Sequence, residues 1–375
     1  MQKKSKYNMA VVGVGAVGIE MLRCLRGRNF PIGDLRVFAR SARDIQVDGQ
    51  NYSVFAISPE GFDGIDIALF AGTEGEKGAA VTYAIEAVKR GAVVIDNGAD
   101  FRMDPKVPLV VPEVNAKDLD LIRNWLLEKK HRPEGRGLAS DKPEGDGLAS
   151  YGQSHSQSHK GIIANPNCST IQMVVAIHPI YEAVGIKRII ACSYQAVSGA
   201  GRSGIEQLEG EIKEYLKLKR KQPLLAAFAY RISKNVIPQI GNFGQDSYTS
   251  EEWKMVHETH KIMHDKNIKI SATCVRVPVE TGHSEAIYLE TRKHITAEKV
   301  RRLLAKNPGI KIFDSTKEGI YPVPSLAEGK DEVFVGRIRR DPFVKNGLWL
   351  WVVSDNLRKG AALNAVQIAE CVISG

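Results

Sequence analysis

The chain has few cysteines and no closely spaced pair of them. The five are scattered over 375 residues, at Cys24, Cys168, Cys192, Cys274 and Cys371. Disulfide frameworks and zinc sites need paired or clustered thiols, so this spacing argues against both and favours a reducing compartment. We therefore expect a cytoplasmic protein without a bound metal.

Long hydrophobic runs are also lacking. No apolar stretch reaches the roughly 18 residues that a membrane-spanning helix requires. The charged N-terminus is followed only by the short apolar run 9–14, which leads into glycines. That pattern is typical of a first strand and not of a signal peptide, and we expect no membrane partner.

A strong charge of one sign is the third absence. The chain has 52 basic and 43 acidic residues, a net charge of +9, and its basic runs at 217–221 and 337–340 are short. Nucleic-acid binding requires cations concentrated on one face. The balance thus favours small anionic substrates over nucleic acid, and the length suggests two domains.

The N-terminal segment carries a strand, a glycine turn and a helix in sequence. Strand residues 9–12 lead into Gly13-Val14-Gly15-Ala16-Val17-Gly18, and helical spacing follows over 19–25. Glycines in this context let the backbone approach a pyrophosphate, which the helix N-terminus binds. We predict dinucleotide contacts from Gly13, Gly15, Ala16, Val17 and Gly18; a glycine turn without a ligand is the alternative.

The second predicted strand, 35–38, bears on the choice of cofactor. NAD-binding proteins place an acid after this strand, whereas here it is followed by Ala39, Arg40 and Ser41. A guanidinium and a hydroxyl suit a 2′-phosphate, so Arg40 and Ser41 favour NADP. The alternative for Arg40 and Arg43 is a solvated loop.

Strands at 65–70 and 93–96, with a helix at 79–90 between them, continue the alternation of strand and helix. This order predicts an α/β fold with an N-terminal Rossmann-like, doubly wound parallel sheet. A Gly, Ser and Pro-rich tandem duplication at 132–160 interrupts it and is predicted as a surface insertion. Its His155 and His159 resemble a metal pair, but no further ligand is spaced to complete a site.

The second half of the chain predicts an α+β catalytic and dimerisation domain. Strands are expected at 188–195, 269–278, 284–291 and 348–353, and helices at 203–221 and 360–373. The last helix follows Ser354-Asp355-Asn356 and can return to the first domain. We therefore predict an NADP-binding domain of 1–164 with 355–375, and a catalytic domain of 165–354.

Cys168 is the candidate nucleophile. Pro166 disfavours a helix through Asn165, and Asn167 is a good N-cap, which places Cys168 in the first helical turn. Backbone N–H groups and the helix dipole stabilise a thiolate there. A cysteine that only packs is the alternative.

His283 is the candidate acid/base partner of that thiol. It lies in a glycine-bearing turn between two predicted strands, seven residues after Arg276. Histidine has a suitable pKa for proton transfer to a thiol or a carbonyl oxygen. A purely structural histidine is the alternative.

Several segments together resemble one enzyme family. They are Ile163 to Thr170 around the cysteine, Tyr194 to Gly201, Phe101 to Asp104, Val107 to Asn115, Ser271 to Pro278, Gly282 to Ser284, and Trp351 to Leu357. In this order they resemble the aspartate-semialdehyde dehydrogenase family, over nearly the whole chain apart from the insertion.

The resemblance implies roles for further residues. It implies that Cys168 attacks the substrate, His283 is the acid/base residue and Gln195 orients the thiohemiacetal. Arg276 would bind the substrate carboxylate, Arg102 and Lys254 the phosphate, and Glu251 the amino group. It also implies cofactor contacts from Ser198, Gly199 and Asn356.

The reaction implied by the resemblance is the NADPH-dependent reductive dephosphorylation of L-aspartyl-4-phosphate to L-aspartate 4-semialdehyde. It belongs to lysine, diaminopimelate, threonine and methionine biosynthesis. The family further implies a homodimer joined through the cysteine-bearing domain.

Two alternatives stay open at this point. N-acetyl-γ-glutamyl-phosphate reductase uses the same chemistry, but its cysteine motif is typically Pro-Gly-Cys-Tyr-Pro-Thr, unlike Asn167-Cys168-Ser169-Thr170. A catalytically impaired nucleotide-binding regulatory homologue is suggested by the shortened glycine loop and by Gly98-Ala99-Asp100, where the family has hydroxyl residues. The joint presence of Cys168, Gln195 and His283 argues against it.

Overall fold

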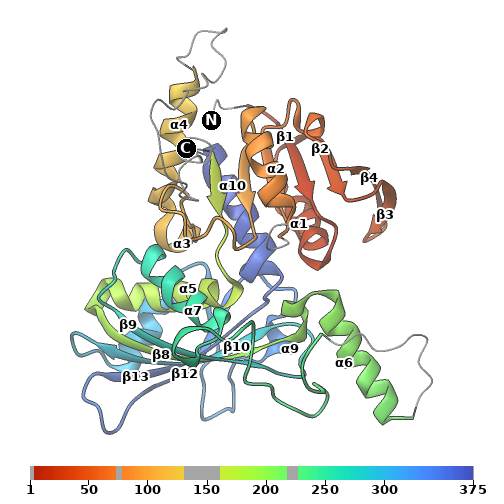
Figure 1. Cartoon of the computed structure of the whole chain (residues 1–375). Coiled ribbons are helices and arrows are strands. Elements are labelled where there is room, and N and C mark those ends of the chain that lie inside the picture. The colour runs from red at the N-terminus through yellow and green to blue at the C-terminus, as the bar shows by residue number, and fades with distance from the viewer. Residues whose placement is uncertain (1–3, 73–77, 131–160, 218–226, 375) are drawn as a thin grey trace, which may run out of the picture.

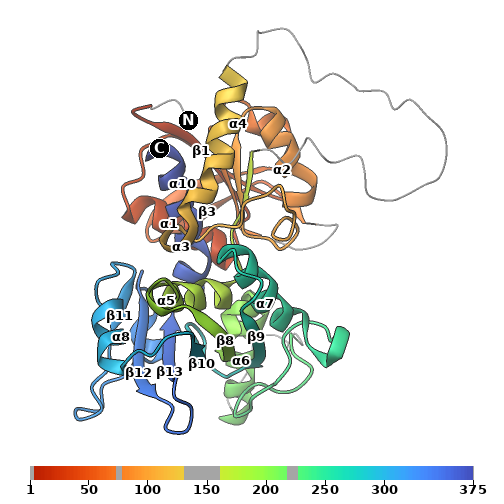
Figure 2. The same cartoon turned by 90° about the vertical axis from the view of Figure 1, so that its left-hand side faces the viewer.

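The computed structural model describes residues 4–72, 78–130, 161–217 and 227–374. Two bodies are stacked on each other, and both chain ends lie in the one that carries the N-terminal sheet (Figure 1). The second body is a broad sheet with helices laid over the side that faces the first (Figure 2).

The first body is built on a seven-stranded sheet of order β3-β4-β2-β1-β5-β6-β7. All neighbours pair in parallel except the edge hairpin β3–β4. Its strands are β1 Tyr7–Val12, β2 Ile32–Ala39, β3 Arg43–Val47, β4 Gln50–Ala56, β5 Ile67–Phe70, β6 Val93–Asp96 and β7 Ile162–Ala164. Parallel strands buried on both faces explain the apolar runs of β1, β5 and β6.

Helices cover both faces of this sheet. The helices here are α1 Ala16–Gly27, α2 Ala79–Lys89, α3 Pro112–Asn115, α4 Asp120–Lys130 and α10 Leu363–Ser374. One apolar cluster joins α1 and α10 to alternate strand residues such as Val11 and Ile95, and another joins α2 to Val12 and Val94. The predicted doubly wound sheet is confirmed, and the last helix returns to it.

The edge hairpin β3–β4 was not among the predicted strands. Asp48 and Gly49 connect it with positive φ angles of 49° and 81°. Asp-Gly is a strong signal for a two-residue hairpin turn, so the sequence does contain the information. The hairpin extends the sheet on the side where Arg40 leaves β2.

The second body is a six-stranded mixed sheet of order β11-β12-β13-β10-β8-β9. The strands are β8 Ile186–Gln195, β9 Lys269–Arg276, β10 His283–Thr291, β11 Ile310–Ile312, β12 Val333–Arg340 and β13 Gly347–Ser354. The helices are α5 Cys168–Val184, α6 Arg202–Tyr215, α7 Ser250–Ile262, α8 Ala297–Leu304 and α9 Pro324–Ala327. Helices α5 and α7 lie between this sheet and the first body (Figures 1 and 2).

Several predicted boundaries differ from the observed ones. The helix predicted at 203–221 ends at Tyr215, because Lys217 adopts a left-handed φ of 57°. Strands β11 and β12 were not predicted. The insertion at 132–160 lies outside the described residues, together with His155 and His159. No helix among the described residues has the length and apolarity needed to cross a membrane.

The strand directions bring distant residues to one edge. Gln195 and Arg276 end the parallel strands β8 and β9 as a register pair, and His283 begins β10, which is antiparallel to β8. Cys168 follows β7, at the edge of the other sheet. Side chains far apart in sequence therefore meet where the two bodies touch.

Candidate active site

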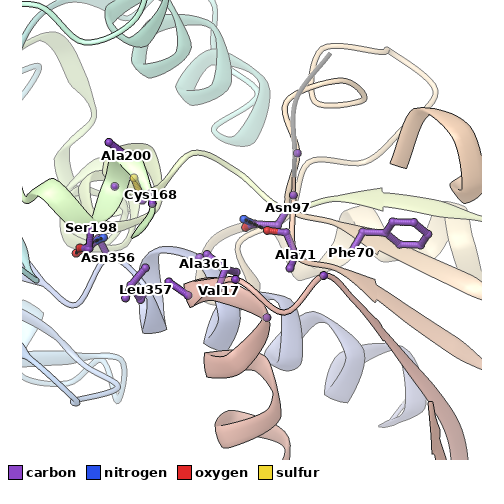
Figure 3. A pocket seen from close by; sticks show the side chains of 18 of the residues that line it. Val17, Phe70, Ala71, Asn97, Cys168, Ser198, Ala200, Asn356, Leu357 and Ala361 are labelled. Carbon is purple, nitrogen blue, oxygen red and sulfur yellow. Dashed lines mark hydrogen bonds between the residues drawn. The ribbon is translucent and has the colours of Figure 1, made fainter. Parts of the chain in front are cut away.

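A cavity of about 1070 Å³ lies between the two bodies. Cys168, Ser198 and Asn356 stand at one end of it and Ala71 toward the other, with Val17 and Ala361 between them (Figure 3). Every predicted catalytic, substrate and cofactor residue lines this cavity except His283. Those lining residues are Cys168, Gln195, Arg102, Arg276, Glu251, Lys254, Gly13, Gly15, Ala16, Val17, Gly18, Arg40, Ser41, Ser198, Gly199 and Asn356.

Helix α5 begins at Cys168, as the sequence predicts. Asn167 is the N-cap: its Oδ1 accepts hydrogen bonds from the N–H groups of Ser169 at 3.0 Å and Thr170 at 3.2 Å. The cap satisfies two donors of the first turn and leaves Cys168 on the cavity wall. The position of the candidate nucleophile is thus fixed by local sequence.

His283 lies beside the thiol, although it does not itself line the cavity. Its Nε2 is 3.2 Å from Cys168 Sγ, and its Nδ1 accepts the Ala196 N–H at 3.1 Å. Burial, together with the nearby Arg276, lowers the pKa of His283 well below its ordinary value. The imidazole is therefore neutral, with its proton on Nε2 and directed at the sulfur.

The thiol differs from the sequence expectation of a stabilised thiolate. Burial and the neighbouring Glu251 raise the pKa of Cys168 to about 12. Arg276, Arg102 and the Ser169 N–H act in the opposite direction but are weaker. Desolvation outweighs the helix N-terminus, and the burial that causes it depends on tertiary contacts.

One residue, Ala196, positions both His283 and the predicted carboxylate ligand. Its carbonyl accepts a hydrogen bond from Arg276 Nη1 at 2.7 Å while its N–H binds His283. The Arg276 guanidinium also lies 5.7 Å from the centroid of the Phe228 ring. An arginine held by a carbonyl and an aromatic face is preoriented for a planar carboxylate.

Helix α7 supplies the predicted substrate pair. Glu251 Oε1 accepts hydrogen bonds from Asn167 Nδ2 at 2.8 Å and Gln195 Nε2 at 3.3 Å. Lys254 Nζ lies 3.6 Å from Glu251 Oε2. The capping box of Thr249 and Glu252 starts this helix beside β9 and so fixes where both side chains stand.

Sequence reasoning did not identify Glu258, which lies further along the same helix. Its carboxylate binds Arg102 Nη1 at 3.0 Å and the Asn167 N–H at 2.6 Å, and the side chain is 1% exposed. Glu251, Lys254 and Glu258 are spaced to share one face of α7. That spacing can be seen in the sequence, whereas the contact between Glu258 and Arg102 cannot.

Ser198 and Asn356, predicted as cofactor contacts, bind each other. Asn356 Nδ2 donates to Ser198 Oγ at 3.0 Å, and Asn356 Oδ1 accepts the Gly282 N–H at 2.9 Å. Asn356 thereby holds the turn that precedes His283. A Cβ on Gly199 would stand 2.8 Å from Arg276 Nη1, so the absent side chain leaves room above that arginine.

The glycine loop has the close packing that a dinucleotide fold requires. A Cβ on Gly18 would lie 1.8 Å from the Gly13 carbonyl oxygen, so only glycine fits there. Among the described residues no side chain caps α1, which begins at Ala16 after Gly15. Its first N–H groups thus face the cavity, the arrangement that binds a pyrophosphate.

Arg40 and Ser41 leave the end of β2 at the far part of the same cavity and are exposed to solvent. Arg43, also on the cavity wall, donates to Ser41 Oγ at 3.3 Å. The residues present therefore fit a dinucleotide with an anionic group near the ribose. Within the described ranges no group of three or more His, Cys, Asp or Glu side chains is arranged to hold a metal ion.

Comparisons with known proteins agree with this geometry. Residues 8–122 match the family model for the NAD-binding domain of semialdehyde dehydrogenases, and residues 177–359 match their dimerisation domain. A nicotinamide dinucleotide is therefore the cofactor.

Several known enzymes are similar to this chain over almost its full length. The aspartate-semialdehyde dehydrogenase of Aquifex aeolicus is 47% identical over 98% of both chains. Aspartate-semialdehyde dehydrogenase II from Vibrio cholerae, solved in complex with ASA, is 40% identical over 99% of both, with a TM-score of 0.83. The enzyme from Candida albicans, solved with NADP, is 25% identical over 98% of both, with a TM-score of 0.69.

These findings confirm the fold class, the enzyme and the reductive reaction predicted from the sequence, with a nicotinamide dinucleotide as the cofactor. The chain belongs to the aspartate-semialdehyde dehydrogenase family of oxidoreductases.

Proposed function

We propose that Cys168 and His283 carry out the family reaction in this chain, the reduction of L-aspartyl-4-phosphate to L-aspartate 4-semialdehyde. The observation that carries the proposal is the 3.2 Å contact of Cys168 Sγ with His283 Nε2 beside a cavity that also holds the glycine loop. A nucleophile, its proton-bearing partner and a dinucleotide loop on one cavity are what a covalent acyl-phosphate reductase needs.

In the first step, Cys168 Sγ bonds to the acyl carbon and the bond from that carbon to the phosphate oxygen breaks. The atoms balance when the thiol proton leaves with the phosphate as HPO₄²⁻. Glu251 contributes to the raised thiol pKa. A substrate ammonium bound to Glu251 offsets that contribution, so substrate binding itself favours the thiolate.

In the second step, a nicotinamide dinucleotide held by the glycine loop would supply the hydride that reduces the carbonyl carbon of the Cys168 thioester. The His283 Nε2–H donates a hydrogen bond to the oxygen that becomes negative, and Gln195 is close enough to the site to orient it. The carbonyl then reforms, the carbon–sulfur bond breaks and the thiolate leaves. No proton needs to pass through Nδ1, which continues to accept the hydrogen bond from the Ala196 N–H.

In the proposed substrate complex, each charged group of the substrate is bound by side chains of the opposite charge. Arg276 binds the substrate carboxylate and Glu251 its amino group, while Arg102 and Lys254 bind the phosphate. All four line the cavity with Cys168. Two cations suit a doubly charged phosphate, and a guanidinium suits a planar carboxylate. The complex of a Vibrio cholerae relative with ASA supports this substrate.

We assign NADP as the preferred cofactor, bound by Gly13, Gly15, Ala16, Val17 and Gly18 through its pyrophosphate. Arg40 and Ser41 bind its 2′-phosphate, while Ser198, Gly199 and Asn356 border the nicotinamide end. The position of Arg40 and Ser41 on the cavity wall supports the assignment. So does the Candida albicans relative solved with NADP.

The active form is proposed to be a homodimer joined through the uncovered face of the second sheet. That face carries Ile190, 39% exposed, and the aromatic pairs Tyr194–Trp351 and Tyr288–Trp349. An apolar sheet face of this kind is typical of subunit interfaces. The match to a dimerisation domain supports the same conclusion.

We keep the division into 1–164 with 355–375 and 165–354 as the domain boundaries. Strand β7 ends the first sheet at Ala164, and α10 packs with α1. All five cysteines are unpaired, which supports a cytoplasmic location.

The proposed function is tested by phosphate-dependent reduction of NADP with aspartate semialdehyde. N-acetylglutamate semialdehyde under the same conditions is the comparison substrate. Turnover confined to aspartate semialdehyde is expected. Turnover confined to the other aldehyde would instead assign the chain to the reductase alternative, and binding of NADPH without any turnover would assign it to the regulatory one.

A further inference from the structure

Two side chains of helix α7, Lys261 and Glu258, hold the loop that carries Arg102. Lys261 Nζ donates to the carbonyl oxygens of Arg102, Asp104 and Val107 at 2.6–2.7 Å. Three carbonyls on one ammonium fix the backbone of the loop. Glu258, one turn earlier on α7, then binds the Arg102 side chain.

The two oxygens of Glu258 are divided between the two bodies of the molecule. Oε1 accepts from Arg102 Nη1 at 3.0 Å, and Oε2 accepts from the Asn167 N–H at 2.6 Å. Arg102 Nη2 in turn donates to the Asn97 carbonyl at 2.8 Å. The guanidinium is therefore held in one orientation by two acceptors, one on each of its terminal nitrogens.

Asn167 connects this carboxylate to the nucleophile. It is the N-cap of α5 and directly precedes Cys168, and its backbone N–H lies outside the helical hydrogen-bond pattern. Glu258 supplies the acceptor that this buried donor requires. One carboxylate thus fixes both the phosphate arginine and the turn that presents the thiol.

We propose that Glu258 is a positioning residue for the phosphate step: it holds Arg102 at the phosphate subsite in register with Cys168. The proposal rests on the assignment of Arg102 and Cys168 under the proposed function. Glu258 acts through those two residues and does not touch the substrate. Arg102 keeps its bond to Glu258 while phosphate binds on the cavity side.

The first test is Glu258→Gln, assayed in the phosphorylating direction with varied inorganic phosphate. The amide retains one oxygen for the Asn167 N–H but turns its NH₂ toward Arg102, which is then displaced. Losing a charged hydrogen bond of this kind predicts a rise in the phosphate KM of about 10-fold or more. The KM for aspartate semialdehyde is expected to change by less than about 3-fold.

Asp314→Asn is the matched control. Asp314 is also a buried carboxylate, 1% exposed, that accepts from an arginine, Arg301, and from a backbone N–H, that of Ile338. It lies outside the cavity, so its substitution is expected to lower the melting temperature without changing the phosphate KM. An equal change of every kinetic constant in both variants would overturn the proposal.

A double-mutant cycle isolates the path of action. In an Arg102→Ala background, Glu258→Gln is expected to add no further rise in the phosphate KM, because the group that it positions is gone. A full additional rise would show that Glu258 acts elsewhere.

A further test uses the unaltered protein and so does not depend on whether a variant folds. A crystal structure with inorganic phosphate is expected to keep the Arg102–Glu258 pair, and an Arg102 that leaves Glu258 for the phosphate overturns the inference. Absence of turnover in the unaltered protein would contradict the proposed function but not the role of Glu258. In that case the affinity for inorganic phosphate, measured by calorimetric titration of Glu258→Gln and Asp314→Asn, still tests that role.

Discussion

The catalytic and cofactor ends of the cavity are built differently. Around Cys168, the side chains of His283, Arg102 and Arg276 are buried and bound to other protein groups. At the other end, Arg40 and Ser41 are exposed on a loop after β2. The catalytic end is preorganised by the protein, whereas the cofactor end is organised mainly by its backbone and by the ligand that it binds.

The largest effect is expected from removing the proposed nucleophile at the catalytic end. Cys168→Ala is expected to reduce turnover by about 10³-fold or more, because no covalent intermediate can form. NADPH affinity and melting temperature should stay near those of the unaltered protein, as steady-state kinetics, fluorescence titration and calorimetry will measure. Cys371→Ala, at a half-buried cysteine of α10, is the control and should remain active. Near-normal turnover of Cys168→Ala would exclude the covalent mechanism.

The pH dependence of the thiol separates burial from the helix N-terminus. With the pKa of Cys168 raised to about 12, the thiolate fraction of the free enzyme grows with pH, and alkylation by iodoacetamide should accelerate about tenfold per unit between pH 7 and 10. Mass spectrometry, with Cys168→Ala as the blank, identifies the alkylated residue. A rate that levels off below pH 8 would mean that the dipole and the arginines outweigh burial.

The exposed end is probed by Arg40→Ala. Removing a charged hydrogen bond to the 2′-phosphate should raise the KM for NADP by about 10-fold to 100-fold and leave the KM for NAD nearly unchanged. Arg26→Ala, another exposed arginine of the first body, serves as the control. Equal kcat/KM with NAD and NADP in the unaltered enzyme would contradict the NADP assignment.

Beneath the catalytic end, Glu285 on β10 is fully buried, and burial raises its pKa well above the ordinary value despite the neighbouring Gln172. The folded state therefore keeps a proton that the unfolded chain releases above about pH 4.3. The contribution of Glu285 to stability is therefore fully present below that pH and declines as the pH rises toward the raised pKa. Glu285→Gln should remove this decline.

The measurement is the free energy of unfolding at pH 5 and pH 8. The difference between the two values should be about 1–2 kcal/mol smaller in Glu285→Gln than in the unaltered protein. Glu290→Gln, at the solvent-accessible end of the same strand, should keep the full difference. An unchanged pH dependence in Glu285→Gln would show that the carboxyl is ionised when folded.

The smallest effect is expected from the insertion, which lies outside the described residues. Replacing 132–160 by a short Gly-Ser linker should leave kcat and KM within about twofold, because a low-complexity segment with this composition is predicted to add little to a core. Loss of activity would place that segment at the cavity or at a subunit contact.

Local patterns accounted for the parts of the site that depend on neighbouring residues. Asn167 caps α5 at Cys168 as predicted, and the glycine loop joins β1 to α1 as predicted. The Asp48-Gly49 dipeptide is likewise a local signal, and it marks the hairpin between β3 and β4. Glu258 shares a helix face with Glu251, but its partner Arg102 stands 156 positions away, and no local pattern encodes such a contact.

By itself, the sequence determined the start of α5 at Cys168, the glycine loop between β1 and α1 and the alternation of strands and helices in the first sheet, because capping, turns and periodicity act over a few residues. Only the tertiary structure decided that His283 is neutral and proton-bearing at Nε2, that burial raises the pKa of Cys168, and that Glu258 holds Arg102. Those properties depend on desolvation and on contacts between distant strands and helices, which exist only once the two sheets have come together.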